Sequence, residues 1–369
     1  MKRIIIFNAS SSLYGAERGL LNLIKALKDD FEITVVIPRR GVLKNRIEKI
    51  CPDAEVIIFP LAVLMSSSSP LYLLKFIFLN FFNFFYFLFY INYNKIDLVV
   101  TNSVLLTFPA LCSCFLNRPH IWHIREFFPS RLVNYFLGRY IKIFSSHIIC
   151  QSEFIKHKFG LKKKAKVIYE PLDEREYKVY RKEIAKERLN VHKDTLVITL
   201  VSRIHPSKGQ YEFIVNMRDV LKNNPKLSLI IAGDVTPPTP RNIRYKRKII
   251  DFIKDYNLKN IILTGFTDDV GLIYSASDIC IFPFKREEPF GICVAEALSF
   301  GKITFYPFEG GLREVYGIFN DGYEFIVENV LKTIENFIGT EDRYKEIVIP
   351  QRLSFSCYMR DIEDTYCGS

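Results

Sequence analysis

The sequence predicts an α/β protein built from two successive parallel-sheet domains. Short runs of β-branched and other apolar residues recur along the chain and alternate with segments of helix length. One charge-dense stretch with little apolar periodicity, Glu170 to Glu187, interrupts this alternation and is interpreted as a linker. Apolar strands that alternate with helices are typical of a parallel sheet covered on both faces. Two such series predict two Rossmann-like domains facing a central cleft.

The first domain is expected to span residues 1–175 and to begin with a strand. The opening residues, Met1 to Phe7, form too short an apolar run for a signal peptide and are typical of a β-strand. Five further runs continue the pattern: Ile33 to Ile37, Val56 to Phe59, Asp97 to Val100, His120 to Ile124 and His147 to Cys150.

The second domain is expected over residues 176–350, and 351–369 is expected to cross back to the first domain. Its strands are predicted at Leu196 to Val201, Leu227 to Ala232, Ile261 to Leu263, Ile279 to Pro283 and Ile303 to Tyr306. Ligands of such sheets bind beyond the carboxyl ends of the strands. The loops that follow these strands are therefore the candidate functional site.

Composition places the chain among ordinary globular proteins and narrows its partners. With 49% hydrophobic and 25% charged residues, it is not intrinsically disordered. The net charge of +11 favours an anionic partner, which could be nucleic acid, a membrane surface or a phosphorylated ligand. The eight cysteines show no metal-site spacing, so we expect reduced thiols in a cytoplasmic protein.

The segment Leu71 to Tyr93 has Lys75 as its only charge and is rich in Phe and Tyr. About 20 apolar residues can span a bilayer. In a helical projection, however, its polar side chains share an arc of about 140°. Three interpretations stay open: a helix that covers the first sheet, an amphipathic helix at a bilayer interface, or a membrane span.

Basic residues of the first half bear on the same question. Clusters lie at Arg39, Arg40, Lys44, Arg46 and Lys49 and again at Lys162, Lys163, Lys164 and Lys166. They form either a solvated surface or a surface attracted to anionic lipid head groups, at about 1 kcal/mol per charge. Together with residues 71–93, they suggest a lipid-linked acceptor at the inner face of the cytoplasmic membrane.

The loop after the first strand, Asn8 to Arg18, leads into a predicted helix over Gly19 to Leu27. A loop of small residues that enters a helix can direct free backbone N–H groups toward an anion. The loop lacks G-x-G-x-x-G, which argues against a dinucleotide site.

Two cations follow the first strand of the second domain. Arg203 and Lys208 lie in the segment Ser202 to Gly209. At the carboxyl end of a strand they can clamp a diphosphate, with arginine as a planar fork and lysine as a point charge.

Two carboxylates follow a later strand of the same domain. Glu288 precedes Pro289, which disfavours helix at Glu288 and permits one to begin just after it. Gly291 would let a ligand approach the backbone, and N–H groups of Gly291 and Ile292 would lie at the positive helix end. Glu296 lies further inside that helix, so the two acids could hold hydroxyl groups at different places along one ligand.

In these motifs the chain resembles the retaining GT-B glycosyltransferases of family four. The resemblance covers nearly the whole chain and is strongest from 197 to 316. Its motifs in the second half are Ser202-Arg203, Lys208-Gly209, Ala232-Gly233-Asp234, Leu263-Thr264-Gly265-Phe266, Glu288-Pro289-Phe290-Gly291, Glu296-Ala297, and Gly310-Gly311 with Glu314. In the first half they are Gly15-Ala16-Glu17-Arg18 and Trp122-His123-Ile124-Arg125-Glu126.

The resemblance implies a role for each candidate residue. Arg203 and Lys208 would bind the donor diphosphate and stabilise the charge on the leaving group, so that no metal is required. Glu288 would contact the donor sugar, and Glu296 the nucleotide ribose. The other implied positions are Phe290, Gly291 and Ile292 at the sugar and phosphate, Gly265 and Phe266 at the base, Gly15 near the diphosphate and acceptor, and His123 at the reacting face of the sugar.

The resemblance also implies the reaction. A retaining enzyme would move a sugar from a nucleoside-diphosphate sugar to a hydroxyl of a glycan or lipid-linked acceptor, in surface polysaccharide or glycolipid synthesis. Retaining glycosidases use one of two carboxylates as a nucleophile, but both acids here are assigned to the donor. We therefore expect the departing phosphate to help deprotonate the acceptor.

Three alternatives stay open: a non-hydrolysing sugar-nucleotide epimerase of the same architecture, a non-catalytic sugar-nucleotide-binding scaffold, and a nucleic-acid binder. The Glu288 and Glu296 arrangement favours transfer over epimerisation. The chain has no recognised nucleic-acid-binding motif, so nucleic acid is not expected as a partner.

Overall fold

The computed structural model describes residues 1–13, 15–64, 70–337 and 347–367. The chain divides into two compact units, one of Met1–Pro171 with Phe355–Ser369 and the other of Leu172–Ser354. In the described residues, the sheet of the first unit has seven strands and that of the second has six. All strand pairs in both sheets are parallel. The predicted α/β class with two Rossmann-like parallel sheets is confirmed.

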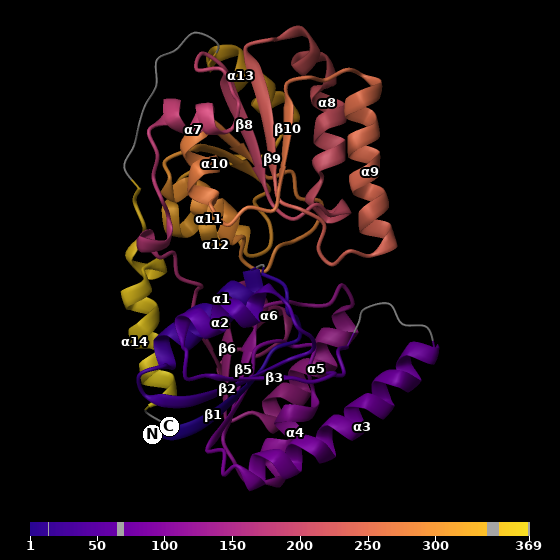
Figure 1. Ribbon diagram of the computed structural model, residues 1–369, viewed down its shortest axis with the longest axis vertical. Coiled ribbons are helices and arrows are strands. Elements are labelled where there is room, and N and C mark those ends of the chain that lie inside the picture. The colour runs from indigo at the N-terminus through magenta and orange to yellow at the C-terminus, as the bar shows by residue number, and fades with distance from the viewer. Residues whose placement is uncertain (14, 65–69, 338–346, 368–369) are drawn as a thin grey trace. The chain divides into compact units, whose positions relative to one another are not determined.

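The first sheet has the strand order β3-β2-β1-β4-β5-β6-β7 (Figure 1). Its strands are β1 (Lys2–Phe7), β2 (Phe31–Ile37), β3 (Glu55–Ile58), β4 (Leu98–Thr101), β5 (His120–Ile124), β6 (His147–Cys150) and β7 (Ala165–Val167). The helices are α1 (Gly15–Leu27), α2 (Val42–Ile50), α3 (Pro70–Tyr93), α4 (Phe108–Phe115), α5 (Arg131–Phe144), α6 (Glu153–Lys158) and α14 (Phe355–Tyr366).

Successive residues of β1 enter opposite cores, because side chains alternate between the two faces of a strand. Ile4 and Ile6 pack in the core that contains α1, α2 and α14. Ile5 and Phe7 pack in the core on the other face, which α3 and α4 cover. A neighbouring cluster continues that second face beneath α5 and α6.

The second sheet has the order β10-β9-β8-β11-β12-β13. Its strands are β8 (Leu196–Val201), β9 (Leu227–Ala232), β10 (Ile261–Gly265), β11 (Ile279–Ile281), β12 (Ile303–Tyr306) and β13 (Tyr323–Glu324). Its α-helices are α7 (Lys182–Arg188), α8 (Gln210–Asn223), α9 (Pro240–Asp255), α10 (Val270–Ala276), α11 (Ile292–Ser299), α12 (Leu312–Phe319) and α13 (Val327–Phe337). Three short 3₁₀ turns are η1 (Glu174–Glu176), η2 (Pro206–Lys208) and η3 (Gln351–Leu353).

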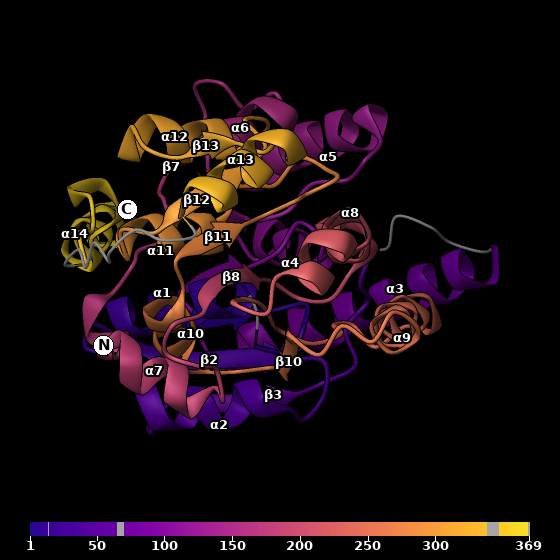
Figure 2. The same cartoon turned by 90° about the horizontal axis from the view of Figure 1, so that it is seen from above.

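The strand order of the second sheet reverses between β8 and β11, which are direct neighbours (Figure 2). From β8 the chain continues outward to β9 and β10, and β11 then begins the other half. Ligands of doubly wound sheets bind at such a switch point. The loops after β8 and β11, which carry the predicted cations and Glu288, therefore start side by side.

The predicted linker from Glu170 to Glu187 was wrong in part, because the segment contains η1 and most of α7. The charges of α7 are used to hold it on the second unit. Lys182 Nζ lies 2.5 Å from Asp278 Oδ1. The buried Lys186 donates to the carbonyls of Lys193 and Thr195, at 2.9 and 2.8 Å.

The C-terminal helix α14 belongs to the first unit, which resumes at Phe355. Tyr358, Ile362 and Tyr366 are buried in the same core as β1 and α1. We expected this return over 351–369. The residues 351–353 form η3, which is part of the second unit.

Candidate functional site

Backbone contacts hold the loops after β8 and β11 against each other in the second unit. Gly209 has φ +71°, and a Cβ there would lie 2.0 Å from the carbonyl oxygen of Pro283. Only glycine accepts both this left-handed conformation and so close an approach. Nearby, the Lys285 N–H donates to the Ser207 carbonyl at 2.9 Å. The loop that carries the two cations is therefore fixed beside the loop that carries Glu288.

Lys208 and Glu288 meet directly at this junction. Lys208 Nζ lies 2.8 Å from Glu288 Oε2, and the two side chains are only 9% and 16% exposed. The same ammonium lies 4.1 Å from the centre of the Phe284 ring. A largely desolvated lysine held by a carboxylate and an aromatic face is a positioned point charge rather than a solvated surface group.

The cation at Lys208 belongs to a larger basic cluster. Arg203 is half-buried after β8 and has no ion-pair partner among the residues described. His205 reports the combined charge: partial burial lowers its pKa to about 4, helped by Arg203, Lys208, Arg241 and Arg286. Sequence reasoning missed the last two arginines, which come from the start of α9 and the loop after β11. The cluster is suited to an anionic ligand.

We expect a bound diphosphate to raise the pKa of His205. An anion near the imidazole favours its protonated form, so the pKa should rise from about 4 by about 1 to 3 pH units. Histidine NMR titrations with and without inorganic diphosphate measure this change, with the exposed His157 as an internal reference. An unchanged His205 pKa at saturating diphosphate would place the anion elsewhere.

Glu296 is the second acid of the site and is almost fully buried on α11. Its Oε1 accepts from the Tyr177 hydroxyl at 3.0 Å, and its Oε2 lies 3.1 Å from the Tyr274 hydroxyl. The Cys293 thiol interacts electrostatically with Lys208, Glu288 and Glu296, while burial raises its pKa to about 12. The structure therefore gathers both acids and Lys208 around the first turn of α11.

The turn into α11 depends on Gly291, which has φ +95°. A Cβ there would lie 2.3 Å from Leu312 Cδ2. Phe290 is fully buried in this structure, and Ile292 is half-buried as the first residue of the helix. Below this loop, the Gly311 N–H donates to the Glu288 carbonyl at 2.9 Å. The β12–α12 turn thus supports the loop that carries Glu288.

Gly265 and Phe266 are the residues predicted at the base. Gly265 ends β10 and Phe266 follows it, two strands from β8, the strand that precedes the cations. Gly265 has φ +70°, and its carbonyl accepts from the Gly233 N–H at 2.8 Å. A Cβ at Gly233 would lie 2.1 Å from the Ser202 carbonyl oxygen. These contacts align the loops after β8, β9 and β10. Phe266, in the loop after β10, is 45% exposed.

Gly15 and His123 belong to the first unit. Gly15 is the first residue of α1, which starts four residues before the predicted Gly19, and a Cβ there would meet nothing within 4 Å. His123 is buried on β5, with Nε2 2.7 Å from the Tyr366 hydroxyl and Nδ1 3.5 Å from Arg125 Nη2. Burial and Arg125 hold the pKa of His123 well below its usual range. Its catalytic role stays a prediction.

A buried polar cluster lies at the carboxyl ends of β1, β4 and β5. Sequence reasoning quoted Arg125 and Glu126 in the motif of His123 without giving them a role, and it missed Asn102. Arg125 Nε donates to Asn102 Oδ1, and Asn102 Nδ2 donates to Asn8 Oδ1, both at 2.8 Å. Arg125 also forms a buried ion pair with Glu170. Next to it, desolvation raises the pKa of Glu126 to about 7. The strand order reverses between β1 and β4, and ligands of doubly wound sheets typically bind at such a point, so this edge is a candidate site.

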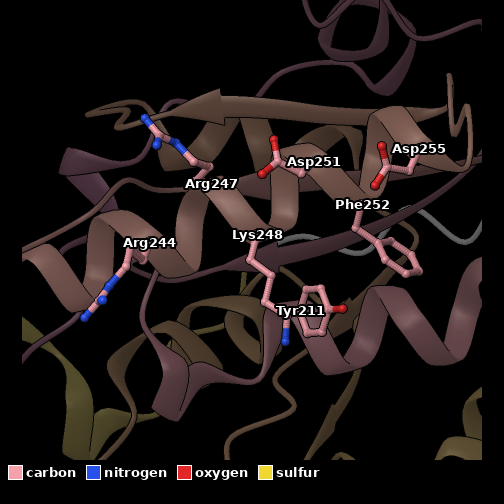
Figure 3. Close-up of a pocket in the computed structure, with 7 residues that line it drawn as sticks. All are labelled: Tyr211, Arg244, Arg247, Lys248, Asp251, Phe252 and Asp255. Carbon is pink, nitrogen blue, oxygen red and sulfur yellow. The ribbon is translucent and has the colours of Figure 1, made fainter.

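A surface cavity of about 280 Å³ lies between α8 and α9 (Figure 3). It is lined by Tyr211, Arg244, Arg247, Lys248, Asp251, Phe252 and Asp255. The Lys248 ammonium lies 3.8 Å from the centre of the Tyr211 ring. None of the predicted site residues lines this cavity, so it is distinct from the loop cluster described above.

Comparison with known proteins gives matches over both units. The family model "Glycosyltransferase Family 4" matches residues 14–176, and "Glycosyl transferases group 1" matches residues 181–339. Trehalose synthase of Pyrococcus horikoshii is 27% identical over 263 residues, which are 67% of this chain and 62% of that protein. A putative glycosyltransferase of Bacillus subtilis, YtcC, is 26% identical over 54% of this chain and 53% of its own. The chain thus spans less than two thirds of the length of these curated relatives.

Solved structures resemble this one over their full length. Anabaena Alr3699/HepE, in complex with UDP and glucose, has a TM-score of 0.79 and 21% identity over the whole of both chains. The lipopolysaccharide outer core galactosyltransferase WaaB has a TM-score of 0.65 and 14% identity, over 100% of this chain and 99% of its own. At such identities the likeness establishes the fold. With family models matching both units, the chain belongs to the group 1 glycosyl transferases of the GT-B fold.

Proposed function

We propose that the protein transfers a sugar from a nucleoside-diphosphate sugar to a hydroxyl group, with retention of anomeric configuration. The Lys208–Glu288 contact, set among arginines at the switch point of the second sheet, carries this proposal. The basic cluster suits the donor diphosphate, and a carboxylate at its edge suits the hydroxyls of the attached sugar.

In the proposed reaction, Arg203 and Lys208 act on the leaving group. The bond between the anomeric carbon and the β-phosphate oxygen breaks, and the electron pair stays with the nucleoside diphosphate. Fixed cations stabilise this growing charge without reorganisation. The departing phosphate takes the proton of the acceptor hydroxyl, whose oxygen bonds to the same face of the sugar. Because two side chains neutralise the diphosphate, we propose that no metal is required.

Other residues would fix the rest of the donor. Glu296 offers a carboxylate for the ribose hydroxyls, and the exposed Phe266 offers a surface for the base. The backbone N–H groups of Gly291 and Ile292 lie at the start of α11, where the helix dipole favours an anion. In the first unit, the polar edge around Asn102 and Arg125 is the proposed acceptor side.

The structural neighbours support a first choice of substrates. HepE was solved with UDP and with UDP-glucose, which favours a UDP-sugar as donor. WaaB is described as a lipopolysaccharide outer core galactosyltransferase, and WaaG as a glycosyltransferase of lipopolysaccharide biosynthesis. We propose by analogy a glycan or lipid-linked acceptor in surface polysaccharide or glycolipid synthesis, and a protein that works at the cytoplasmic face of the membrane.

The function is tested by turnover of a donor panel. The protein is incubated in EDTA with UDP-, GDP-, ADP- or dTDP-sugars, with and without lipid-linked or oligosaccharide acceptors. One donor class is expected to raise the melting temperature and to release its nucleotide only with an acceptor, and NMR should show a retained anomeric configuration. Isomerised donor without acceptor would indicate an epimerase instead. Binding without turnover across the acceptor panel would favour the scaffold.

A further inference from the structure

Helix α3 of the first unit exposes most of its apolar side chains to solvent. A helix on the surface of a soluble protein turns its apolar stripe inward and its polar side outward. In α3, only Asn83, Phe87 and Ile91 are buried, although the helix is 24 residues long and highly apolar. By length and composition it could cross a membrane, and 11% of its most apolar window is buried inside the protein.

Much of the polar arc of α3 faces the protein body, although Lys75, Tyr86 and Tyr93 of the same arc are exposed. Four polar side chains spread along the helix make these inward contacts: Tyr72, Asn80, Asn83 and Tyr90. The buried Asn83 accepts from the Ala62 N–H at 2.8 Å and donates to the Pro60 carbonyl at 2.9 Å. Tyr90 donates to Glu55 at 2.9 Å. Asn80 accepts from the Thr107 hydroxyl at 3.2 Å, and Tyr72 donates to the Val63 carbonyl.

The apolar arc of α3 therefore faces outward. Its exposed members are Leu74, Ile77, Phe78, Phe81, Phe85 and Phe89. Phe78 and Phe89, about three turns apart on the helix, are 70% and 71% exposed. A row of large apolar side chains this long exceeds the scattered apolar residues found on ordinary surfaces, and it marks an interaction site.

Two other helices that cover the same face of the sheet, α4 and α5, also carry exposed apolar side chains (Figure 1). Phe115 at the end of α4 is 72% exposed, and its ring lies 5.3 Å from that of Phe84 on α3. On α5, Leu132, Phe136 and Ile143 are exposed along one helical stripe. Tyr140 of α5 donates to the Thr107 carbonyl at 2.9 Å, which ties α5 to the start of α4.

The charge of these helices identifies the partner. Together α3, α4 and α5 carry four basic residues and no Asp or Glu. The basic residues are Lys75, Arg131, Arg139 and Lys142. An apolar row with tyrosines and only positive charges complements the interface of a bilayer that contains anionic lipids.

We propose that α3, α4 and α5 form one docking surface for an anionic membrane leaflet, with α3 lying in the interface along its length. Tyr72, Asn83 and Tyr90 each form a hydrogen bond to the protein body, so α3 is fixed at several points along its length. Crossing the bilayer would break them, so α3 lies on the membrane and does not span it. The purpose of this surface, access to a lipid-linked acceptor, rests on the proposed function.

Vesicle binding tests the surface. The wild-type protein is expected to float with vesicles of phosphatidylcholine and phosphatidylglycerol, and more weakly with phosphatidylcholine alone. Replacing Phe78, Phe81 and Phe89 with serine should lower the affinity at least about tenfold. A control with Ile184→Ser and Ile243→Ser, exposed apolar residues of the second unit, should bind normally. Wild-type protein that stays unbound, or an equally weakened control, would overturn the proposal.

The basic residues and the depth of α3 are tested separately. Replacing Arg131, Arg139 and Lys142 with glutamine should remove most of the preference for phosphatidylglycerol, at about fivefold per charge. A Phe81→Trp variant is mixed with vesicles of brominated lipids. Lipids with bromine near the head group should quench the fluorescence of the new tryptophan more than lipids with bromine at the acyl chain ends. Stronger quenching at the chain ends would indicate a span and overturn the interfacial orientation.

Two further measurements separate this proposal from its rivals. The triple serine variant should keep the thermal shift that UDP gives the wild type, because α3 carries no proposed donor residue. If the serine variant loses vesicle binding but keeps the thermal shift with UDP, the substitutions affect the membrane surface alone. If the wild type shows no thermal shift with UDP, that result contradicts the proposed function alone. A lipid-free dimer that the serine variant converts to monomer would assign the surface to a second copy and overturn the proposal.

Discussion

Replacing Lys208 with alanine is expected to lower kcat about 10²–10³-fold, which corresponds to about 2.7–4 kcal/mol of lost transition-state stabilisation. Lys208 holds a desolvated charge beside Glu288, where the proposed leaving group develops its negative charge. The interaction strengthens as the bond to the diphosphate breaks, so kcat should fall more than KM rises. Steady-state kinetics with the donor identified by the panel measure this split.

The same substitution leaves Glu288 without its lysine, and a loss of stability could imitate a loss of catalysis. Breaking a fully buried ion pair costs about 3–5 kcal/mol, and we expect less here because Glu288 keeps 16% exposure. A Lys208→Met, Glu288→Gln double variant removes both charges and should regain most of the melting temperature. Its turnover should stay low. Turnover that returned together with stability would assign Lys208 a structural role.

The sequence predicted most strands, because the parallel strands of both sheets are buried on two sides and form apolar runs. It missed the short β7 and β13, and β13 is exposed. The sequence-based prediction failed where polar residues hold one element against another. The dense charge from Glu170 to Glu187 suggested a linker, but Lys182 forms an ion pair with Asp278, and Lys186 donates to the carbonyls of Lys193 and Thr195. Such partners lie on other elements, so composition within the segment cannot reveal them.

The candidate site was predictable as a set of loops but not as a set of contacts. Sequence order placed Arg203 and Lys208 after one strand and Glu288 after another, and parallel topology brought these loops together. The direct contact of Lys208 with Glu288 depends on Gly209, whose close approach to Pro283 no local pattern shows. Periodicity likewise found two arcs on α3, but only the structure shows that polar side chains such as Asn83 and Tyr90 face inward.

Replacing Glu296 with glutamine is expected to raise the donor KM about 10- to 150-fold with a smaller change in kcat. A hydrogen bond to a charged group is worth about 1.5–3 kcal/mol, and a ribose contact is the same in the ground state and the transition state. Glutamine keeps the shape of the side chain and can still pair with the hydroxyls of Tyr177 and Tyr274. Titration with the nucleotide sugar and initial rates measure the effect.

Inorganic diphosphate provides the matched control for Glu296, because it contains the diphosphate group of the donor but no ribose. Glu296→Gln should weaken UDP binding and leave diphosphate binding unchanged, whereas Lys208→Ala should weaken both. Tyr177→Phe removes one hydroxyl that donates to Glu296 without removing the acid, so its UDP affinity should stay near that of the wild type. Equal losses of UDP and diphosphate affinity in Glu296→Gln would mean that the acid organises the loop and does not hold the ribose.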